Sequence, residues 1–312
     1  MTLRHMKIFV SVYQNSSITK AAKELHLAQP SVSVTIKELE EYYGQHFFER
    51  IGRRIYPTAA AKEFYGYAVH IVSLFEAMEK ELKNGDEIGT IRVGASITIG
   101  THILPSLMKE FQEQFPEIRM EAVVNQSGTI ERLLLENEID LGLIENQPSS
   151  DSVCAVPFLE DSLVAIVPAE HPLAGKCDVT LREMAENPFL MREKGSAGRE
   201  ILDACFDMEQ ITVHPAWESS STRAIVQGVA KGLGVAVLPY LLVKRDLEQG
   251  LVCQAFLRRP IERKLNIIYH KSKYITRSMQ TFVSMCLDYG THQIKEEQQD
   301  GRNEDPDPDS RS

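Results

Sequence analysis

Serine, histidine and glycine are the residues whose spacing could support catalysis in this chain, and none of them forms a catalytic motif. Segments 94–98 and 194–198 each place a serine near glycine, but each lacks one glycine of the G-x-S-x-G turn that presents a nucleophilic serine. Segment 232–234 lacks the third glycine of a dinucleotide-binding turn and follows a predicted helix. The nine histidines show no H-E-x-x-H spacing and no clustering with cysteine. We therefore predict no catalytic residue, no metal, no cofactor and a protein that is not an enzyme.

A second set of polar residues lies where predicted strands end and predicted helices begin. Backbone N–H groups are free at a helix start and the helix dipole favours negative charge there, so hydroxyls and a guanidinium at such points suit a small anion. Any single Ser or Thr of this kind can instead be an ordinary N-cap. Arg199 can instead form a surface ion pair with Glu193, Glu200 or Asp203. The predicted effector-binding residues are Ser96, Thr98, Gln126, Ser127, Asn146, Ser196 and Arg199.

A third set of residues suits contact with double-stranded DNA. Two short helical patterns over 18–43 have the helix-turn-helix form, whose second helix can enter a major groove. On its exposed face an amide can read adenine, hydroxyls can reach phosphate or bases, and a valine can touch a thymine methyl. A basic turn around Gly52 follows and suits a β-wing on phosphate. The predicted DNA-binding residues are Gln29, Pro30, Ser31, Ser33, Val34, Lys37, Arg50, Arg53 and Arg54.

The elements that must position these residues begin with short helices over residues 1–58. A long helix follows, with Thr58 as its predicted N-cap and Asn84-Gly85-Asp86 as its end. Apolar residues step along this helix by four and three, which predicts a coiled-coil seam with a second chain; packing on the helix's own domain is the alternative. The predicted dimerisation residues are Phe64, Ala68, Ile71, Phe75 and Met78.

From residue 91 onward, short apolar runs alternate with helical periodicity. The predicted strands are 91–95, 120–124, 140–144, 162–167, 235–238 and 265–269, with helices over 102–115, 128–137, 197–206, 221–231, 240–248 and 276–289. This alternation predicts α/β sheets covered by helices, and about 200 residues allow two lobes. The acidic end from residue 294, with its repeated Asp-Pro steps, is predicted to be disordered.

Composition restricts the class of protein. The chain has 312 residues and a net charge of −10, yet residues 1–58 carry eight Lys or Arg against five Glu, so the basic excess is N-terminal. Five scattered cysteines without a C-x-x-C pair favour a reducing cytoplasm. Neither a membrane span nor a signal peptide is predicted.

The sequence also resembles the LysR-type transcriptional regulators. The block over 21–40, then Gly44, segments 47–50 and 57–58, and later the run over 232–239 carry this resemblance, which extends over roughly residues 1–290. Two positions depart from the family pattern. Ala28 stands where a capping Ser or Thr is usual, and Ala61 where a Gly is usual, so the local helix geometry there is in question.

The resemblance implies an α/β protein with an N-terminal all-α winged helix-turn-helix, a long linker helix and a two-lobed effector domain like that of periplasmic binding proteins. We expect a DNA-binding domain over 1–58, a linker and dimerisation helix over 59–88, an effector-binding domain over 89–293 and a tail over 294–312. The expected partners are promoter DNA, a small anionic effector, further copies of the chain as a dimer of dimers, and RNA polymerase, with no membrane. A solute-binding protein without a DNA role is the alternative.

Overall fold

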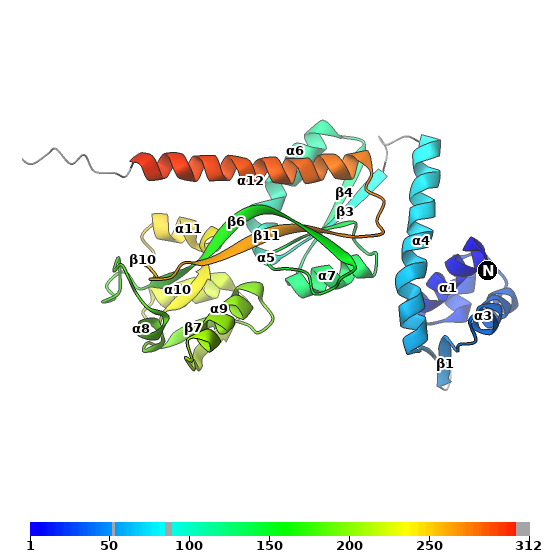
Figure 1. Cartoon of the computed structure of the whole chain (residues 1–312), viewed down its shortest axis with the longest axis horizontal. Helices are drawn as coiled ribbons and strands as arrows, with labels where there is room; N and C mark the ends of the chain where they lie inside the picture. Colours follow the sequence, from blue (N-terminus) through cyan, green and yellow to red (C-terminus); the bar gives the residue numbers. More distant parts are fainter. Residues whose placement is uncertain (52–53, 85–88, 304–312) are drawn as a thin grey trace, which may run out of the picture.

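The computed structural model describes residues 1–51, 54–84 and 89–303, and Figure 1 shows two parts joined by one long helix. The N-terminal part contains α1 (Leu3–Asn15), α2 (Ile18–Glu24), α3 (Gln29–Tyr43) and an antiparallel hairpin of β1 (Phe48–Ile51) and β2 (Arg54–Pro57). Ser17 caps α2 by accepting a hydrogen bond from the Lys20 backbone N–H at 3.3 Å. Ala28 makes no side-chain cap, and α3 nevertheless begins at Gln29 with a proline in its first turn, a position that tolerates proline.

The linker helix α4 (Ala59–Asn84) packs on α1 along its first half. Thr58 caps it as predicted, because its hydroxyl accepts a hydrogen bond from the Ala61 N–H at 3.1 Å. Phe64 contacts the aromatic core around Phe9, and Ala68 is fully buried in the same core. Within the single chain these two residues therefore pack on the N-terminal core and do not form a free seam, and their place at a dimer interface stays a prediction. The predicted helix end at Gly85 and Asp86 lies outside the described residues.

One mixed sheet runs through both lobes of the second part, in the order β10-β6-β11-β5-β3-β4 with β9 also paired to β6. Lobe I contains the parallel strands β3 (Gly89–Ala95), β4 (Ile118–Val124) and β5 (Leu141–Ile144), with helices α5 (Ile97–His102), α6 (Leu104–Gln114) and α7 (Ser127–Leu135). Lobe II contains β7 (Phe189–Arg192), β8 (Pro215–Ser219), β9 (Ala236–Pro239) and β10 (Cys253–Ala255), with α8 (Leu181–Ala185), α9 (Ala197–Met208), α10 (Thr222–Ala230) and α11 (Tyr240–Glu248).

Two long strands cross from one lobe to the other. β6 (Val153–Val167) and β11 (Ile261–His270) pair antiparallel along their length, and their register shifts between Leu265 and Asn266. Such an irregularity bends a strand locally. α12 (Arg277–Asn303) lies along the top of both lobes in Figure 1. Gly290 permits this close approach, because a Cβ there would stand 1.7 Å from the carbonyl oxygen of Phe158 in β6.

The end of α12 corrects one sequence-based prediction. Residues 294–303, expected to be disordered, continue the helix to Asn303, because the Lys-, Glu- and Gln-rich run over 295–299 has high helix propensity. Residues 304–312 lie outside the described part of the chain. Within that described part, no helix is both long and apolar enough to cross a bilayer.

Candidate effector site and DNA-facing surface

The outer face of α3 carries most of the residues predicted to contact DNA. Val32, Ile36 and Leu39 are buried in the N-terminal core, which turns the opposite side of the helix outward. The exposed residues on that side are Gln29, Pro30, Ser31, Val34 and Lys37, and Ser33 is half-buried beside them.

The polar groups of this face are weakly restrained. The Gln29 amide donates to the Ser33 hydroxyl at 3.3 Å, and Lys37 pairs with Glu41 at 3.4 Å between highly exposed side chains. Arg50 is exposed in β1, Arg54 begins β2, and Arg53 lies outside the described residues. The valine side chain of residue 34, 54% exposed, has no structural reason to face water, and this suits a face that contacts another molecule.

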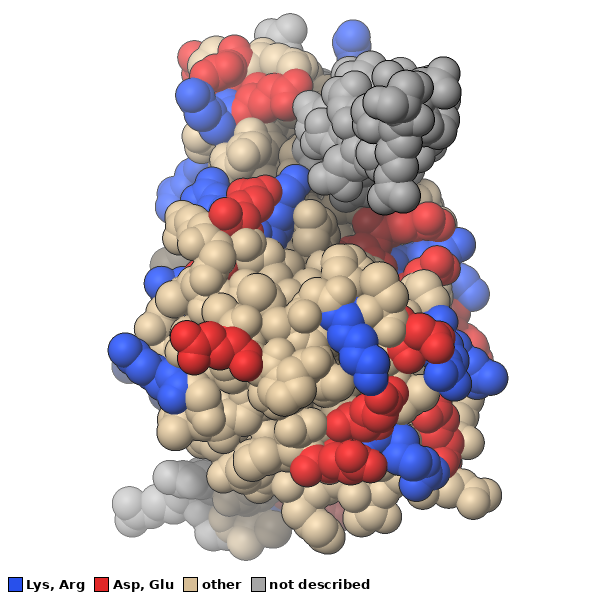
Figure 2. Space-filling view, turned by 90° about the vertical axis from the view of Figure 1, so that its left-hand side faces the viewer, with Lys and Arg blue, Asp and Glu red and all other residues tan. Residues whose placement is uncertain are grey.

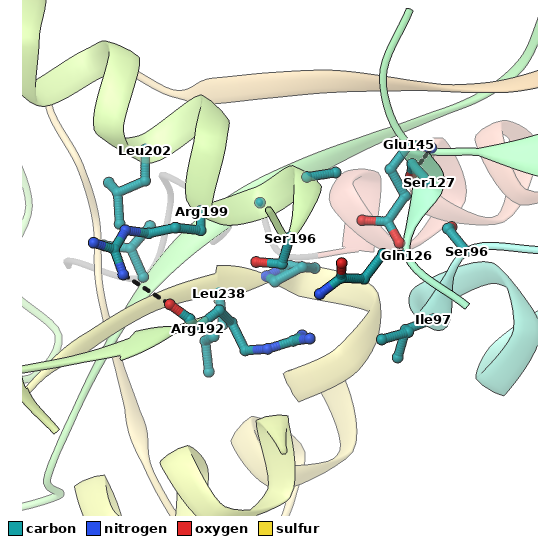
Figure 3. A pocket seen from close by; sticks show the side chains of 14 residues that line it. Ser96, Ile97, Gln126, Ser127, Glu145, Arg192, Ser196, Arg199, Leu202 and Leu238 are labelled. Atoms are coloured by element: carbon teal, nitrogen blue, oxygen red, sulfur yellow. Dashed lines mark hydrogen bonds between the residues drawn. The ribbon is translucent and has the colours of Figure 1, made fainter. Parts of the chain in front are cut away.

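The predicted effector residues gather at the boundary between the two lobes. A cavity of about 20 Å³ lies there, with an apolar wall that includes Val237 and Leu238 of β9. Figure 3 shows side chains from α5, α7 and α9 converging on this space. The predicted residues that line it are Ser96, Gln126, Ser127, Ser196 and Arg199.

Two buried hydroxyls at this cavity have no partner. Ser96 precedes α5 in lobe I and is 1% exposed, and Ser196 precedes α9 in lobe II and is 7% exposed. Neither Oγ makes a well-formed hydrogen bond to a described residue, and neither caps its helix. Ser96 does lie close enough to the Glu145 carboxylate to favour its ionised form. Because buried hydroxyls are nearly always hydrogen-bonded, an unpaired one on each lobe points to a missing partner between them.

A buried ion cluster holds the lobe I side of the site. Glu145 follows β5, and its carboxylate accepts a hydrogen bond from the Thr98 backbone N–H at 3.1 Å and pairs closely with Arg263 of β11. Arg263, 1% exposed, also donates to Asp161 of β6 at 2.6 Å. Burial disfavours the ionised form of Glu145, but the charge of Arg263, the hydrogen bond from Thr98 and the nearby Ser96 hydroxyl outweigh it and hold its pKa below the usual range. The cluster thus joins lobe I to both crossover strands.

The two arginines of lobe II at this cavity already form ion pairs and hydrogen bonds within the protein. Arg199 pairs with Asp203 at 2.8 Å and with Glu218 at 3.2 Å, and it also donates to the Arg192 carbonyl, the contact dashed in Figure 3. An ion pair of Arg199 with Asp203 was the alternative prediction for this residue, and it is the arrangement observed. Arg192 itself donates to Glu193 at 2.9 Å and to the Thr222 hydroxyl at 2.8 Å.

Thr98 and Asn146 do not line the cavity. Thr98 is buried at the second position of α5, and its hydroxyl lies 3.4 Å from Arg263. The Asn146 carbonyl accepts a hydrogen bond from Asn266 at 3.1 Å. Sequence reasoning missed the two other charged lining residues, Glu145 and Arg192. Each directly follows or ends an apolar strand, and a charge at a strand end was the available signal.

The second half of α4 carries an exposed apolar face. Its side chains and two neighbours surround a hollow of about 540 Å³ with almost no polar lining: Leu3, Ile71, Leu74, Phe75, Met78 and Tyr274. Three of the five predicted dimerisation residues, Ile71, Phe75 and Met78, belong to this face.

A winged helix-turn-helix joined by one long helix to two lobes around a polar cavity defines a DNA-binding regulator that responds to a small molecule. The chain belongs to the LysR family: the model for bacterial regulatory helix-turn-helix proteins of the lysR family matches residues 3–62, and the LysR substrate binding domain matches residues 84–291. The family, the fold class and the regulatory function predicted from sequence are thereby confirmed.

Individual relatives agree with this assignment. The chain is 31% identical over 290 residues to the RuBisCO operon transcriptional regulator of Allochromatium vinosum, covering 92% of this chain and 96% of the relative. A full-length OxyR variant from Pseudomonas aeruginosa has the same fold, with a TM-score of 0.72 at 24% identity, covering 92% of this chain and 94% of that one. The regulatory domain of Synechocystis CcmR, solved in complex with 2-PG, gives a TM-score of 0.61 at 27% identity over 65% of this chain and 97% of its own.

Proposed function

We propose that this LysR-family regulator binds a small anion between its two lobes and that the anion changes the arrangement of the lobes and hence promoter binding. The observation that carries the proposal is a buried hydroxyl without a well-formed hydrogen bond on each lobe of one cavity, from Ser96 and Ser196. A ligand that accepts a hydrogen bond from each would satisfy both and would favour the arrangement of the lobes that holds the ligand between them. Only a ligand with different affinities for two arrangements can shift their populations.

The sign of the ligand charge follows from the donors around the cavity. Ser196 and Gln126 precede α9 and α7, and neither side chain caps its helix, so the first backbone N–H groups of both helices remain available. Free N–H groups, hydroxyls and the positive ends of two helices favour an anion. Arg263 pairs with Glu145 and with Asp161, so it offsets only one of the two negative charges on the lobe I side, and the donors at the helix starts have to outweigh the other.

The size of the cavity links binding to movement. About 20 Å³ accommodates a single water molecule, so an organic anion or a sulfate-sized ion requires the lobes to separate first. The crossover strands and their register shift at Leu265 are the natural place for that movement. The regulatory domain of CcmR, solved in complex with 2-PG, offers an example of a small molecule bound in a related fold.

The remaining parts complete the proposed regulator. We assign residues 1–58 to DNA binding, 59–88 to the linker and dimerisation, and 89–293 to effector binding. The α3 face would enter a major groove, and the exposed half of α4 would pair with a second copy in a dimer or dimer of dimers. The proposed protein acts on promoter DNA in the cytoplasm, engages RNA polymerase there and catalyses no reaction.

Calorimetry with a panel of carboxylates and oxyanions tests the proposed site. The wild type should bind at least one anion, and Ser96→Ala and Ser196→Ala should weaken that binding about 10- to 100-fold, because each removes a hydrogen bond to a charged group. The exposed Ser106 of α6 supplies a matched control, since Ser106→Ala removes the same hydroxyl outside the cavity.

Unliganded Ser196→Ala should be as stable as the wild type or slightly more stable, because it removes a buried hydroxyl that has no partner. A neutral or cationic effector bound equally well by the wild type and both cavity variants would refute the proposed anion site.

A further inference from the structure

A pair of stacked histidines joins the linker helix to lobe I. The ring of His70 in α4 lies on the ring of His270 at the end of β11, with centroids 3.6 Å apart and planes 11° from parallel. His70 is only 5% exposed, and neither of its ring nitrogens forms a well-formed hydrogen bond to a described residue. A buried imidazole without a partner is costly unless it is neutral, and this one lies at the contact between the DNA-binding part and the effector domain.

A buried cation is fixed beside the two rings. Lys273, three residues after His270, donates to Asp140 at 2.6 Å and to the side-chain oxygen of Asn137 at 3.1 Å. Asp140 also pairs with Arg92 at 2.8 Å. Two cations share one carboxylate here, and the charge of Lys273 opposes protonation of both rings.

Other charged groups surround the same contact. A groove of about 530 Å³ between α4 and lobe I contains both histidines, and its edges carry Lys62 and Glu63 from α4 with Asp151 and Lys271 from lobe I. These four residues supply two charges of each sign at the exposed edge. Tyr65 precedes His70 in α4. Burial raises the pKa of Tyr65, and the charges of Glu136 and Glu138, beyond the end of α7, raise it further. None of these carboxylates pairs with an imidazole nitrogen of His70.

We propose that the His70–His270 stack is a pH-sensitive latch between the linker helix and lobe I, closed when both imidazoles are neutral and released when either is protonated. The latch lies outside the effector cavity and works without a ligand, so it goes beyond the function proposed above. Because α1, α2 and α3 are packed on α4, release would free the DNA-reading part from its position on the effector domain.

The direction of the pH dependence follows from the surroundings of the rings. Burial, reinforced by His270 and Lys273, lowers the pKa of His70 from 6.5 to about 4, against a weak opposing effect of the Leu135 carbonyl. Burial and Lys273 also lower the pKa of His270. The docked contact is therefore fully formed above pH 6.5 and weakens as the pH falls towards 4. The linkage relation gives a docking constant about 30-fold lower at pH 5 than at pH 7.5 for His70 alone.

Two measurements on the full-length protein test the latch. Titration of selectively ¹³C-labelled histidine by NMR should show His70 titrating well below its ordinary range. Paired spin labels at Lys62→Cys and Lys271→Cys, in a background without the native cysteines and diluted with unlabelled chains, should give one short distance at pH 7.5. A second, longer distance should grow as the pH falls to 5.

His70→Phe and His270→Phe each keep a stacked ring that cannot be protonated, so the label distance should lengthen less at pH 5 in either variant than in the wild type. The double variant has no protonatable ring at the contact, and its distance should stay short at pH 5. His214→Gln removes an exposed histidine of lobe II and should behave like the wild type. An ordinary His70 pKa near 6.5, an unchanged distance in the wild type, or a longer distance that persists in the double variant would each overturn the latch. These readouts need no effector, so failure of the anion site would leave them unaffected.

Discussion

Arg263 is the residue on which the geometry of the effector domain depends most. Its guanidinium is 1% exposed and joins Asp161, its register partner on β6, to Glu145 of lobe I. Buried ion pairs add little net stability compared with a well-packed apolar alternative, but removal of one partner leaves the remaining charges unpaired in a low-dielectric interior. Without the guanidinium, the carboxylates of Asp161 and Glu145 would have to be protonated or hydrated.

Replacement of Arg263 by methionine should therefore lower the free energy of unfolding by about 3–5 kcal/mol. Urea denaturation at pH 7 measures this change. The neighbouring Lys264 is the matched control: it is 60% exposed and lies 3.7 Å from an exposed Glu160, so Lys264→Met should change stability by less than about 0.5 kcal/mol. Equal effects of the two substitutions would contradict a special role for Arg263.

The site was partly predictable from sequence for a physical reason. Ser96 and Ser196 were found because a helix start after a strand can be recognised from local periodicity. The commitment of Arg199 to Asp203, four residues later on the same helix, was also open to prediction. The contact between Arg263 and Glu145 was not, because it joins positions 118 residues apart whose meeting depends on the crossover topology.

At the scale of elements, α4 has two halves with different neighbours. Tyr65, Val69 and Val72 are buried against the N-terminal core, whereas Ile71 and Met78 are more than 40% exposed. Apolar residues spaced alternately by four and three cannot distinguish a helix that packs on its own domain from one that pairs with a second chain, since both kinds of packing produce this spacing. The pattern predicted the helix correctly, but it did not reveal that the first half packs on α1, an intramolecular partner that precedes the helix in the chain.

Ile71→Glu should disrupt self-association through the exposed half of α4. A carboxylate at this position would place two like charges opposite each other in an apolar dimer interface. Sedimentation at micromolar protein should show a shift from the oligomer towards the monomer. Ala59→Glu adds the same charge at the exposed first residue of α4 and should leave the oligomer intact. A dimer that persists in Ile71→Glu would place the interface elsewhere.

The strands and helices of the effector domain show the same division between local and long-range information. The parallel strands of lobe I and most helices were predicted within a few residues. β6 was predicted only over 162–167, although it begins at Val153. Its first half is interrupted by Pro157 and polar residues, and it becomes a strand because β11 pairs with it on the other side of the lobe boundary.

At the scale of the whole molecule, charge is divided between the two parts. Residues 1–58 have an excess of three positive charges, so the remainder of the chain carries −13. Figure 2 shows the end of the molecule farthest from α4, where Lys and Arg are interspersed with Asp and Glu and no large basic area occurs. Phosphate should repel most of the effector domain, which confines DNA contact to the N-terminal part.

If DNA contacts only the N-terminal part, the salt dependence of binding reports the number of phosphate contacts made there. Arg50→Ala should weaken binding to every sequence and reduce the slope of log affinity against log salt by about one unit, because one phosphate contact is lost. Gln29→Ala should instead cost about 1–3 kcal/mol at the preferred base pair alone and leave the slope unchanged.

Fluorescence anisotropy with promoter fragments and single-base variants, over a range of salt concentrations, separates the two effects. Lys109→Ala removes the same charge from exposed α6 and should change neither quantity. If Lys109→Ala weakened binding as much as Arg50→Ala, DNA would have to contact the effector domain as well, and the confinement argued from the charge distribution would be wrong.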